Sequence, residues 1–317
     1  MFMPPPPSLR PPDQLPPSRP HQQSRPTQIK PALPPGAGFL APVLWCHFSR
    51  AQSLVPGLSY CWRRRARLVS MTAIDTTVMS TVEIEAERLR RKREVALGYR
   101  IFASLRWGDL GDGHITARDP EHTDCMWLLR YPVGFERATI DDLVLVRADG
   151  TTLDGRPINE TAYHIHHPIH EARPDVVGVA HTHTPWGTPF CATGRGLEPI
   201  TQEACQFHDR WAYFDDEEVQ VLGLAGGERI AESLGLNQAM LLRSHGLLTT
   251  GTSVAETIAA FVTLERVTEA HMKVPDAEPI SEESARIARE DLLGKRAQEL
   301  AFQFLVQRHV GDPSVVG

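Results

Sequence analysis

Residues 176–187 read VVGVAHTHTPWG, an apolar run that ends in polar residues. Turn-forming residues lie on both sides, Arg173–Asp175 before the run and Pro185–Gly187 at its end. A short apolar segment between turn signals predicts a buried strand. Side chains alternate between the two faces of a strand, so His181 and His183 should share a face, with Cα atoms about 7 Å apart. Two imidazoles placed in this way can bind one metal ion.

A second apolar run also ends in a histidine. Residues 240–248 read MLLRSHGLL, so His245 lies at the polar end of a run and just before a glycine. The chain has 14 histidines, and a histidine is more often a surface or hydrogen-bonded residue than a ligand, so a His-x-His pair is weak evidence by itself. With the second run included, the candidate metal ligands are His181, His183 and His245.

Together these motifs resemble the class II aldolase/adducin family. Its metal-dependent members carry Arg-Pro-Asp, a strand, His-x-His and a later His-Gly, which are here Arg173–Asp175, His181–His183 and His245–Gly246. The resemblance extends from about Glu83 to about Lys273. It implies an α/β fold of the fuculose-phosphate aldolase type: a three-layer α/β/α domain with a mostly antiparallel or mixed central sheet and the metal at one sheet edge.

The resemblance also has consequences for the cofactor and the assembly. It implies a divalent metal ion bound by the three histidines, with Zn²⁺ as the first expectation, and a His₃ site also suits Fe²⁺ or Mn²⁺. It further implies a homo-oligomer, such as a homotetramer, in which the C-terminal region reaches the site of a neighbouring subunit.

Two segments correspond to the phosphate-binding elements of the family. The first, residues 108–118, has His114 in place of an asparagine and Thr116 in place of a serine, and the second, Tyr131–Gly134, lacks a serine hydroxyl. A phosphate needs clustered N–H, hydroxyl or cationic donors. These differences disfavour a phosphorylated sugar. We expect Gly113, His114 and Thr116 to contact a non-phosphorylated substrate, and a structural role for His114 stays open.

A helix is predicted over about Glu160–Ala172, with Asn159 as its cap, and Pro168 is expected to interrupt it. The segment holds four histidines. Two of them share a helical face and are candidates for contact with the substrate, namely His166 and His170.

The resemblance places a catalytic glutamate on this helix, eleven residues before Arg173, where this chain has Ala162. The nearest acid is Glu160, two residues earlier, which is about 200° away around the helix. Glu160 is therefore the candidate acid/base only if the helix is locally rebuilt, with His208 and Tyr213 as further candidates.

The N-terminal part differs in composition from the rest of the 317 residues. It holds 13 of the 26 prolines within residues 1–35, and residues 1–70 carry nine Lys or Arg against one acid. Such a segment buries too little apolar surface to fold, so we expect a disordered tail over residues 1–70. It is a transit peptide, an interaction arm with a basic patch at Arg63–Arg65, or an upstream extension before a natural start at Met71. We favour the extension because the tail has no helical or strand periodicity.

Charge and cysteine content restrict the class of protein. The whole chain carries −6 and residues 1–70 carry +8, so the remainder carries −14, which argues against nucleic acid as a partner. No segment reaches about 18 consecutive apolar residues, so no membrane span is expected. An odd number of cysteines without a CxxC pair argues against a disulfide framework and for the cytoplasm. The five cysteines are Cys46, Cys61, Cys125, Cys191 and Cys205.

Beyond the tail we expect a class II aldolase/adducin-like domain over residues 71–275 and a C-terminal helical extension over residues 276–317. Ser80–Glu83 predicts the capped start of a helix that ends near Leu105, and Ser253–Glu256 predicts another that ends near Lys273. The other expected elements are a β-hairpin over residues 141–153, an irregular segment over 191–216 and helices over 226–235 and 281–308.

Three functions remain open. The first is a metal-dependent lyase of the aldolase type, in which the metal acts as a Lewis acid on a small hydroxy-carbonyl or keto-acid substrate and stabilises an enediolate. The second is a non-haem Fe²⁺ oxygenase that oxidatively decarboxylates aryl pyruvates, as related antibiotic-biosynthesis enzymes of this fold do. The third is a non-catalytic, adducin-like interaction module, which the retained histidines disfavour.

Overall fold

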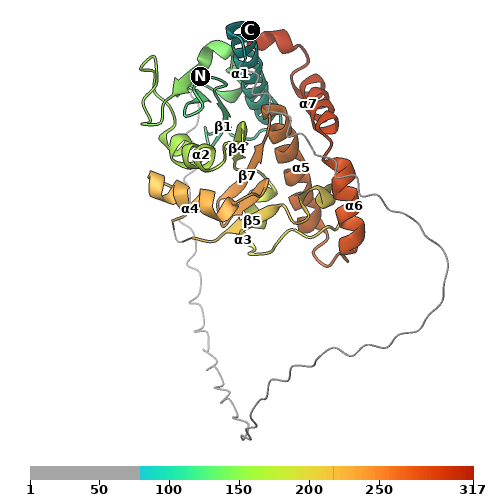
Figure 1. Ribbon diagram of the computed structural model, residues 1–317. Coiled ribbons are helices and arrows are strands. Elements are labelled where there is room, and N and C mark those ends of the chain that lie inside the picture. Colours follow the sequence, from blue (N-terminus) through green and yellow to red (C-terminus); the bar gives the residue numbers. More distant parts are fainter. Residues whose placement is uncertain (1–78, 217) are drawn as a thin grey trace, which may run out of the picture. The chain divides into compact units, whose positions relative to one another are not determined.

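The structure is a computed structural model that describes residues 79–216 and 218–317, and the prediction of a disordered tail lies outside these residues. The described part of the chain belongs to one compact unit (Figure 1). Its C-terminus lies beside the first helix, where Nε of Arg93 donates a hydrogen bond to the carbonyl oxygen of Gly317 at 2.8 Å.

A single mixed sheet of seven strands runs through this unit, in the order β3-β2-β1-β4-β7-β6-β5. Every neighbouring pair is antiparallel except β5 and β6, which are parallel. The strands are β1 (Gly113–Arg118), β2 (Met126–Leu129), β3 (Leu143–Val146), β4 (Gly178–Thr182), β5 (Trp211–Phe214), β6 (Ala239–Leu242) and β7 (Gly246–Gly251).

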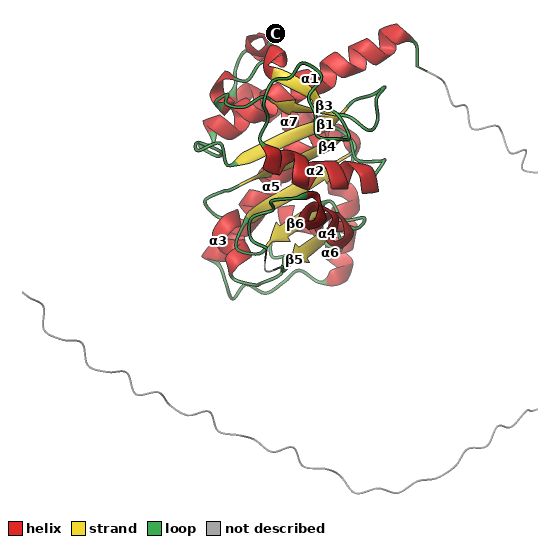
Figure 2. Cartoon of the chain, turned by 90° about the vertical axis from the view of Figure 1, so that its left-hand side faces the viewer, coloured by secondary structure: helices red, strands yellow, loops and turns green. Residues whose placement is uncertain are grey.

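Helices cover both faces of the sheet. They are α1 (Thr81–Ser104), α2 (Glu160–Ala172), α3 (Gly187–Ala192), α4 (Leu224–Leu234), α5 (Val254–Lys273), α6 (Glu282–Leu292) and α7 (Lys295–His309). On one face, buried side chains of α1, α5 and α7 share a core with Ala180 of β4. On the other, which Figure 2 shows from outside, α2 and α4 share a core with Val179. This alternation along β4 confirms the predicted three-layer α/β/α fold.

Two long helices begin at the predicted capping residues. The Ser80 side chain accepts a hydrogen bond from the backbone N–H of Glu83, whose carboxylate accepts one from the N–H of Ser80. Ser253 caps α5 by accepting from the N–H of Glu256 at 3.1 Å. These bonds satisfy N–H groups that have no partner within the helix.

The helix α2 continues through Pro168, so the expected interruption there is wrong. A proline lacks the N–H that would bond to the carbonyl four residues earlier, here that of His164. A Cβ atom on Gly227 of α4 would lie only 1.8 Å from this carbonyl oxygen, so the absent side chain lets the two helices meet there. The helix α2 therefore packs closely against α4 in the turn that contains the proline.

Other differences concern short elements and one helix break. The segment expected to be irregular, residues 191–216, contains the end of α3, a 3₁₀-helix over Glu203–Phe207 and strand β5. The second strand of the expected hairpin is reduced to a bridge between Val146 and Thr152. The single helix expected at the C-terminus is two helices, α6 and α7, and Phe302 and Val306 of α7 are buried in the main core.

Within the described residues, no helix has both the length and the apolar character needed to cross a membrane.

Candidate metal centre

The structure brings His181, His183 and His245 together, with one ring nitrogen of each lying within 4.8 Å of the others. The ring centroids of His181 and His245 are 4.7 Å apart, and that of His183 lies 5.0 Å from His245 and 5.5 Å from His181. The sheet explains this convergence, because β4 pairs with β7 and the turn before β7 carries His245 to the end of β4.

A backbone contact fixes the ring of His181, and a tight turn positions His245. Nδ1 of His181 lies 2.8 Å from the carbonyl oxygen of Leu247, so it carries the proton and leaves Nε2 free to bind a metal. His245 lies in a tight turn between β6 and β7, in which Ser244 adopts a positive φ of 54°. A Cβ atom on Gly246 would lie 3.2 Å from the His181 ring, so the absent side chain makes room for that ring.

The buried His181 and the half-buried His245 have lowered pKa values. Burial lowers the pKa of His181 well below its ordinary value, and the neighbouring rings of His245 and His114 lower it further. Burial lowers the pKa of His245 to about 4, with a second contribution from His183. These rings are therefore neutral at neutral pH, which is the form that binds a metal ion.

Asp112 lies beside the site, although its sequence context does not predict a site residue. One of its carboxylate oxygens is 3.4 Å from Nδ1 of His183, and its carbonyl oxygen accepts hydrogen bonds from Thr182 Oγ1 at 2.7 Å and from the N–H of His183 at 3.3 Å. A carboxylate in this position orients a ligating imidazole. The pairing of β1 with β4 brings it there, and a single sequence does not reveal that register.

The three side chains fit a divalent metal ion by their chemistry. Three neutral imidazoles are a common donor set for Zn²⁺ and Fe²⁺, and such a set leaves coordination positions open. They line a cavity of about 410 Å³, the histidine cavity, in which a small molecule has room beside the metal. The cavity is lined by Asp112, Gly113, His114, Asn159, Thr161, His181, His183, Thr188, Val219, Gln220, Ser244 and His245.

Of the predicted substrate contacts, Gly113 and His114 line this cavity and the other three do not. Nδ1 of His114 lies 2.8 Å from Nε2 of His166. Behind them, Thr116 Oγ1 lies 2.8 Å from Nδ1 of His166 and 2.9 Å from Nε2 of His170. Thr116, His166 and His170 thus form a buried chain that supports the His114 ring, and none of the three lines the histidine cavity.

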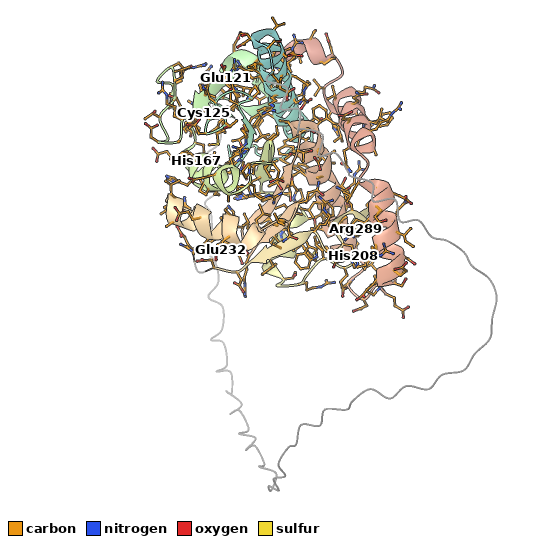
Figure 3. The ribbon with its side chains drawn as sticks, viewed as in Figure 1. Glu121, Cys125, His167, His208, Glu232 and Arg289 are labelled. Atoms are coloured by element: carbon orange, nitrogen blue, oxygen red, sulfur yellow. The ribbon has the colours of Figure 1, made fainter. Side chains whose placement is uncertain are left out.

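The three predicted catalytic residues are not among those that line the histidine cavity. Glu160 is exposed at the first position of α2. His208 lines a different cavity together with Trp211, and its carbonyl oxygen accepts a hydrogen bond from Arg289 of α6 (Figure 3). Tyr213 lies on β5 and donates its hydroxyl to the carbonyl oxygen of Cys191 at 2.8 Å. A catalytic role for His208 or Tyr213 therefore has no support in this geometry.

Comparison with known families gives a match over most of the described chain. The family model "Class II Aldolase and Adducin N-terminal domain" matches residues 93–272. One similar solved structure is the L-fuculose 1-phosphate aldolase from Glaciozyma antarctica PI12, at 30% identity and a TM-score of 0.63, covering 73% of this chain and 94% of that one.

Two curated relatives are more similar in sequence. The first, from Streptomyces roseochromogenus subsp. oscitans, is named 4-hydroxy-3-prenylphenylpyruvate oxygenase/4-hydroxy-3-prenylbenzoate synthase and is 39% identical over 203 residues. That alignment covers 62% of this chain and 73% of the relative. The second, Decarboxylase NovR of Streptomyces niveus, is 38% identical over 199 residues, which is 61% of this chain and 73% of the relative.

Proposed function

The chain belongs to the class II aldolase/adducin family, and from this premise we propose that it is a metal-dependent enzyme that decarboxylates a 2-keto acid with consumption of O₂. In this reaction the keto acid loses its carboxyl carbon as CO₂. The acid product is one carbon shorter and contains both atoms of O₂. The observation that carries the proposal is the cluster of His181, His183 and His245 at the wall of the histidine cavity.

A divalent ion held by these histidines, Fe²⁺ for this reaction, would bind the keto acid as a Lewis acid and supply the redox chemistry. The protein itself orients the site. Leu247 holds the tautomer of His181, and Asp112 lies beside the ring of His183. His114 lines the cavity with its Nδ1 taken by His166, so its other ring nitrogen is available to the substrate.

Two observations favour this reaction over aldol cleavage. Asp112 is the one carboxylate among the residues that line the cavity, all of which the structure describes, and it already lies beside a candidate ligand. Aldol cleavage needs a free acid/base group. Glu160, the candidate from the sequence, does not line the cavity. The two curated relatives named above as an oxygenase and a decarboxylase support the same direction.

A second candidate is a metal-dependent lyase acting on a hydroxy-carbonyl compound. It is supported by the 30% identity to the L-fuculose 1-phosphate aldolase. In that reaction Asp112 would move the proton and Zn²⁺ would serve as the metal. A non-catalytic interaction module, the third candidate, would have no need of bound metal.

The test is an assay of the protein loaded separately with Fe²⁺, Zn²⁺ or Mn²⁺ and given 4-hydroxyphenylpyruvate. We expect equal amounts of O₂ consumed and CO₂ released with Fe²⁺, and no turnover without O₂. Cleavage of a hydroxy-carbonyl compound by the Zn²⁺ form without O₂ would instead support the lyase. Failure to retain any of the three metals would contradict both enzymes and favour the interaction module.

A further inference from the structure

A second cavity of about 220 Å³ adjoins the histidine cavity, and both are lined by Gly113, His114 and Asn159. We call it the apolar cavity, because eight of its residues are apolar or aromatic. They are Tyr99, Leu110, Leu128, Leu129, Tyr131, Pro132, Val133 and Phe135. An apolar cavity of about 150 Å³ is large enough to hold benzene, so the apolar cavity has room for a substituted six-membered ring.

The walls of the apolar cavity are held in place without a ligand. Phe135 packs edge-on against Tyr99, with ring centroids 4.7 Å apart and an interplanar angle of 64°. The Tyr99 hydroxyl is fixed in turn by the backbone of Ile115, since it donates to the carbonyl oxygen at 3.0 Å and accepts from the N–H at 2.8 Å. A preformed concave surface with apolar walls and a few polar groups is typical of a small-molecule site.

The charges around the apolar cavity do not favour an anion. Arg130 is the one cation among the residues that line it, all of which the structure describes, and Asp142 already binds its guanidinium at 2.8 and 3.0 Å. At the turn of Gly134, the carboxylate oxygens of Glu136 lie 2.6 and 2.7 Å from the position that a Cβ atom would take. The lining therefore offers a phosphate no free cation, and a carboxylate lies against the wall at Gly134.

We propose that the apolar cavity binds the uncharged aromatic end of the substrate while the acidic end lies against the three histidines. The substrate class is then a 2-keto acid with an aryl group, and His114 and Asn159 lie where the two ends join. This inference rests on the proposed function for the acidic end only. The aromatic end is assigned from the lining and charges of the apolar cavity.

The first arm of the experiment tests the apolar cavity alone. Ligand-observed NMR with the full chain free of metal measures the binding of phenol and of inorganic phosphate, so that neither probe can bind a metal ion. Val133→Trp fills the cavity, and Tyr131→Ala removes an exposed part of its wall if the first variant does not fold. The matched control is Leu153→Trp, which adds the same side chain at an exposed position that lines an unrelated cavity.

The second arm tests whether one molecule spans both cavities. Calorimetry compares phenylpyruvate with pyruvate on the same proteins after loading with Zn²⁺. Because burial of a few apolar groups discriminates ligands by about 10–200-fold, we expect phenylpyruvate to bind at least about tenfold more tightly than pyruvate. Val133→Trp should remove most of this difference, leave the pyruvate affinity within about twofold, and abolish phenol binding. Leu153→Trp should leave the preference for phenylpyruvate, the pyruvate affinity and phenol binding unchanged.

Equal affinity for the two acids, phosphate binding better than phenol, or an unchanged phenylpyruvate preference in Val133→Trp and Tyr131→Ala would overturn the inference. The two proposals fail separately. If phenol binds and depends on Val133 but neither acid needs the metal, the aromatic site stands and the proposed function is contradicted. If pyruvate binding needs the metal but phenol does not bind, only the aromatic site is contradicted.

Discussion

His181 and His183 have different partners at Nδ1. The partner of His183 is a side chain, that of Asp112. It lies 3.4 Å from Nδ1 of the His183 ring, whereas Nδ1 of His181 meets a backbone carbonyl. Replacement of the carboxylate by an amide should leave the fold unchanged and allow the His183 ring to turn. We expect Asp112→Asn to weaken metal binding by about 10–100-fold, the usual effect of losing such a partner.

Competition with a chromogenic chelator measures this affinity. Asp109→Asn is the matched control, since Asp109 lies in the same loop with a side chain that is 55% exposed. Equal metal affinity for Asp112→Asn and wild type would show that the carboxylate does not orient the ring.

The buried chain behind His114 makes stability depend on pH. Burial lowers the pKa of His166 well below its ordinary value and that of His170 to about 3, so both stay neutral in the folded protein at mildly acidic pH. In the unfolded chain they take up protons below about pH 6.5. The unfolded state then binds more protons, so the free energy of unfolding should decrease as pH falls from about 6.5 towards 3.

Urea denaturation at several pH values between these limits measures the effect. His170→Gln should make the decrease shallower, because one group that is protonated only on unfolding has been removed. His122→Gln, at a side chain that is 57% exposed, is the control. An unchanged slope in His170→Gln would contradict this origin of the pH dependence.

At the scale of elements, the contact of α2 with α4 positions the buried side chains behind His114, because α2 carries His166 and His170. A side chain at Gly227 would collide with the carbonyl oxygen of His164, whereas a Cβ on Gly223 would meet no atom within 4 Å. We expect Gly227→Ala to lower the free energy of unfolding by about 1–3 kcal/mol, as overpacking usually does. Gly223→Ala should cost less than about 1 kcal/mol. Equal stability of the two variants, measured by urea denaturation, would contradict close packing at Gly227.

Elements with strong local signals could be predicted from the sequence. Strand β4 has a buried apolar run, and the caps of α1 and α5 are visible as Ser80 and Ser253. Strand β5 has no such signal, because its four residues are only partly buried at the edge of the sheet, where it pairs in parallel with β6, the next strand along the chain. The interruption expected at Pro168 is wrong, because α2 continues through the proline, where it packs closely against α4.

For the whole molecule, the order of the sheet decides which predicted site residues meet. The convergence of the three histidines could be predicted because each lies at the end of an apolar run of a familiar pattern. Asp112 and the apolar cavity could not, because they depend on the register of β1 with β4 and on the packing of Phe135 against Tyr99. The position of His208 also depends on packing that the sequence does not reveal, and its side chain lines a different cavity. The expectation of a homo-oligomer stays a prediction.

The most direct test of the account is the metal content of purified wild-type protein and of His183→Ala, measured by elemental analysis with melting temperatures recorded in parallel. The His183 side chain is 41% exposed, so its truncation should leave the fold intact. We predict about one divalent ion per chain in the wild type and loss of most of it in the variant, because two imidazoles bind a metal far more weakly than three. Full occupancy in folded His183→Ala, or no divalent ion retained by wild-type protein after loading, would contradict a centre built from His181, His183 and His245.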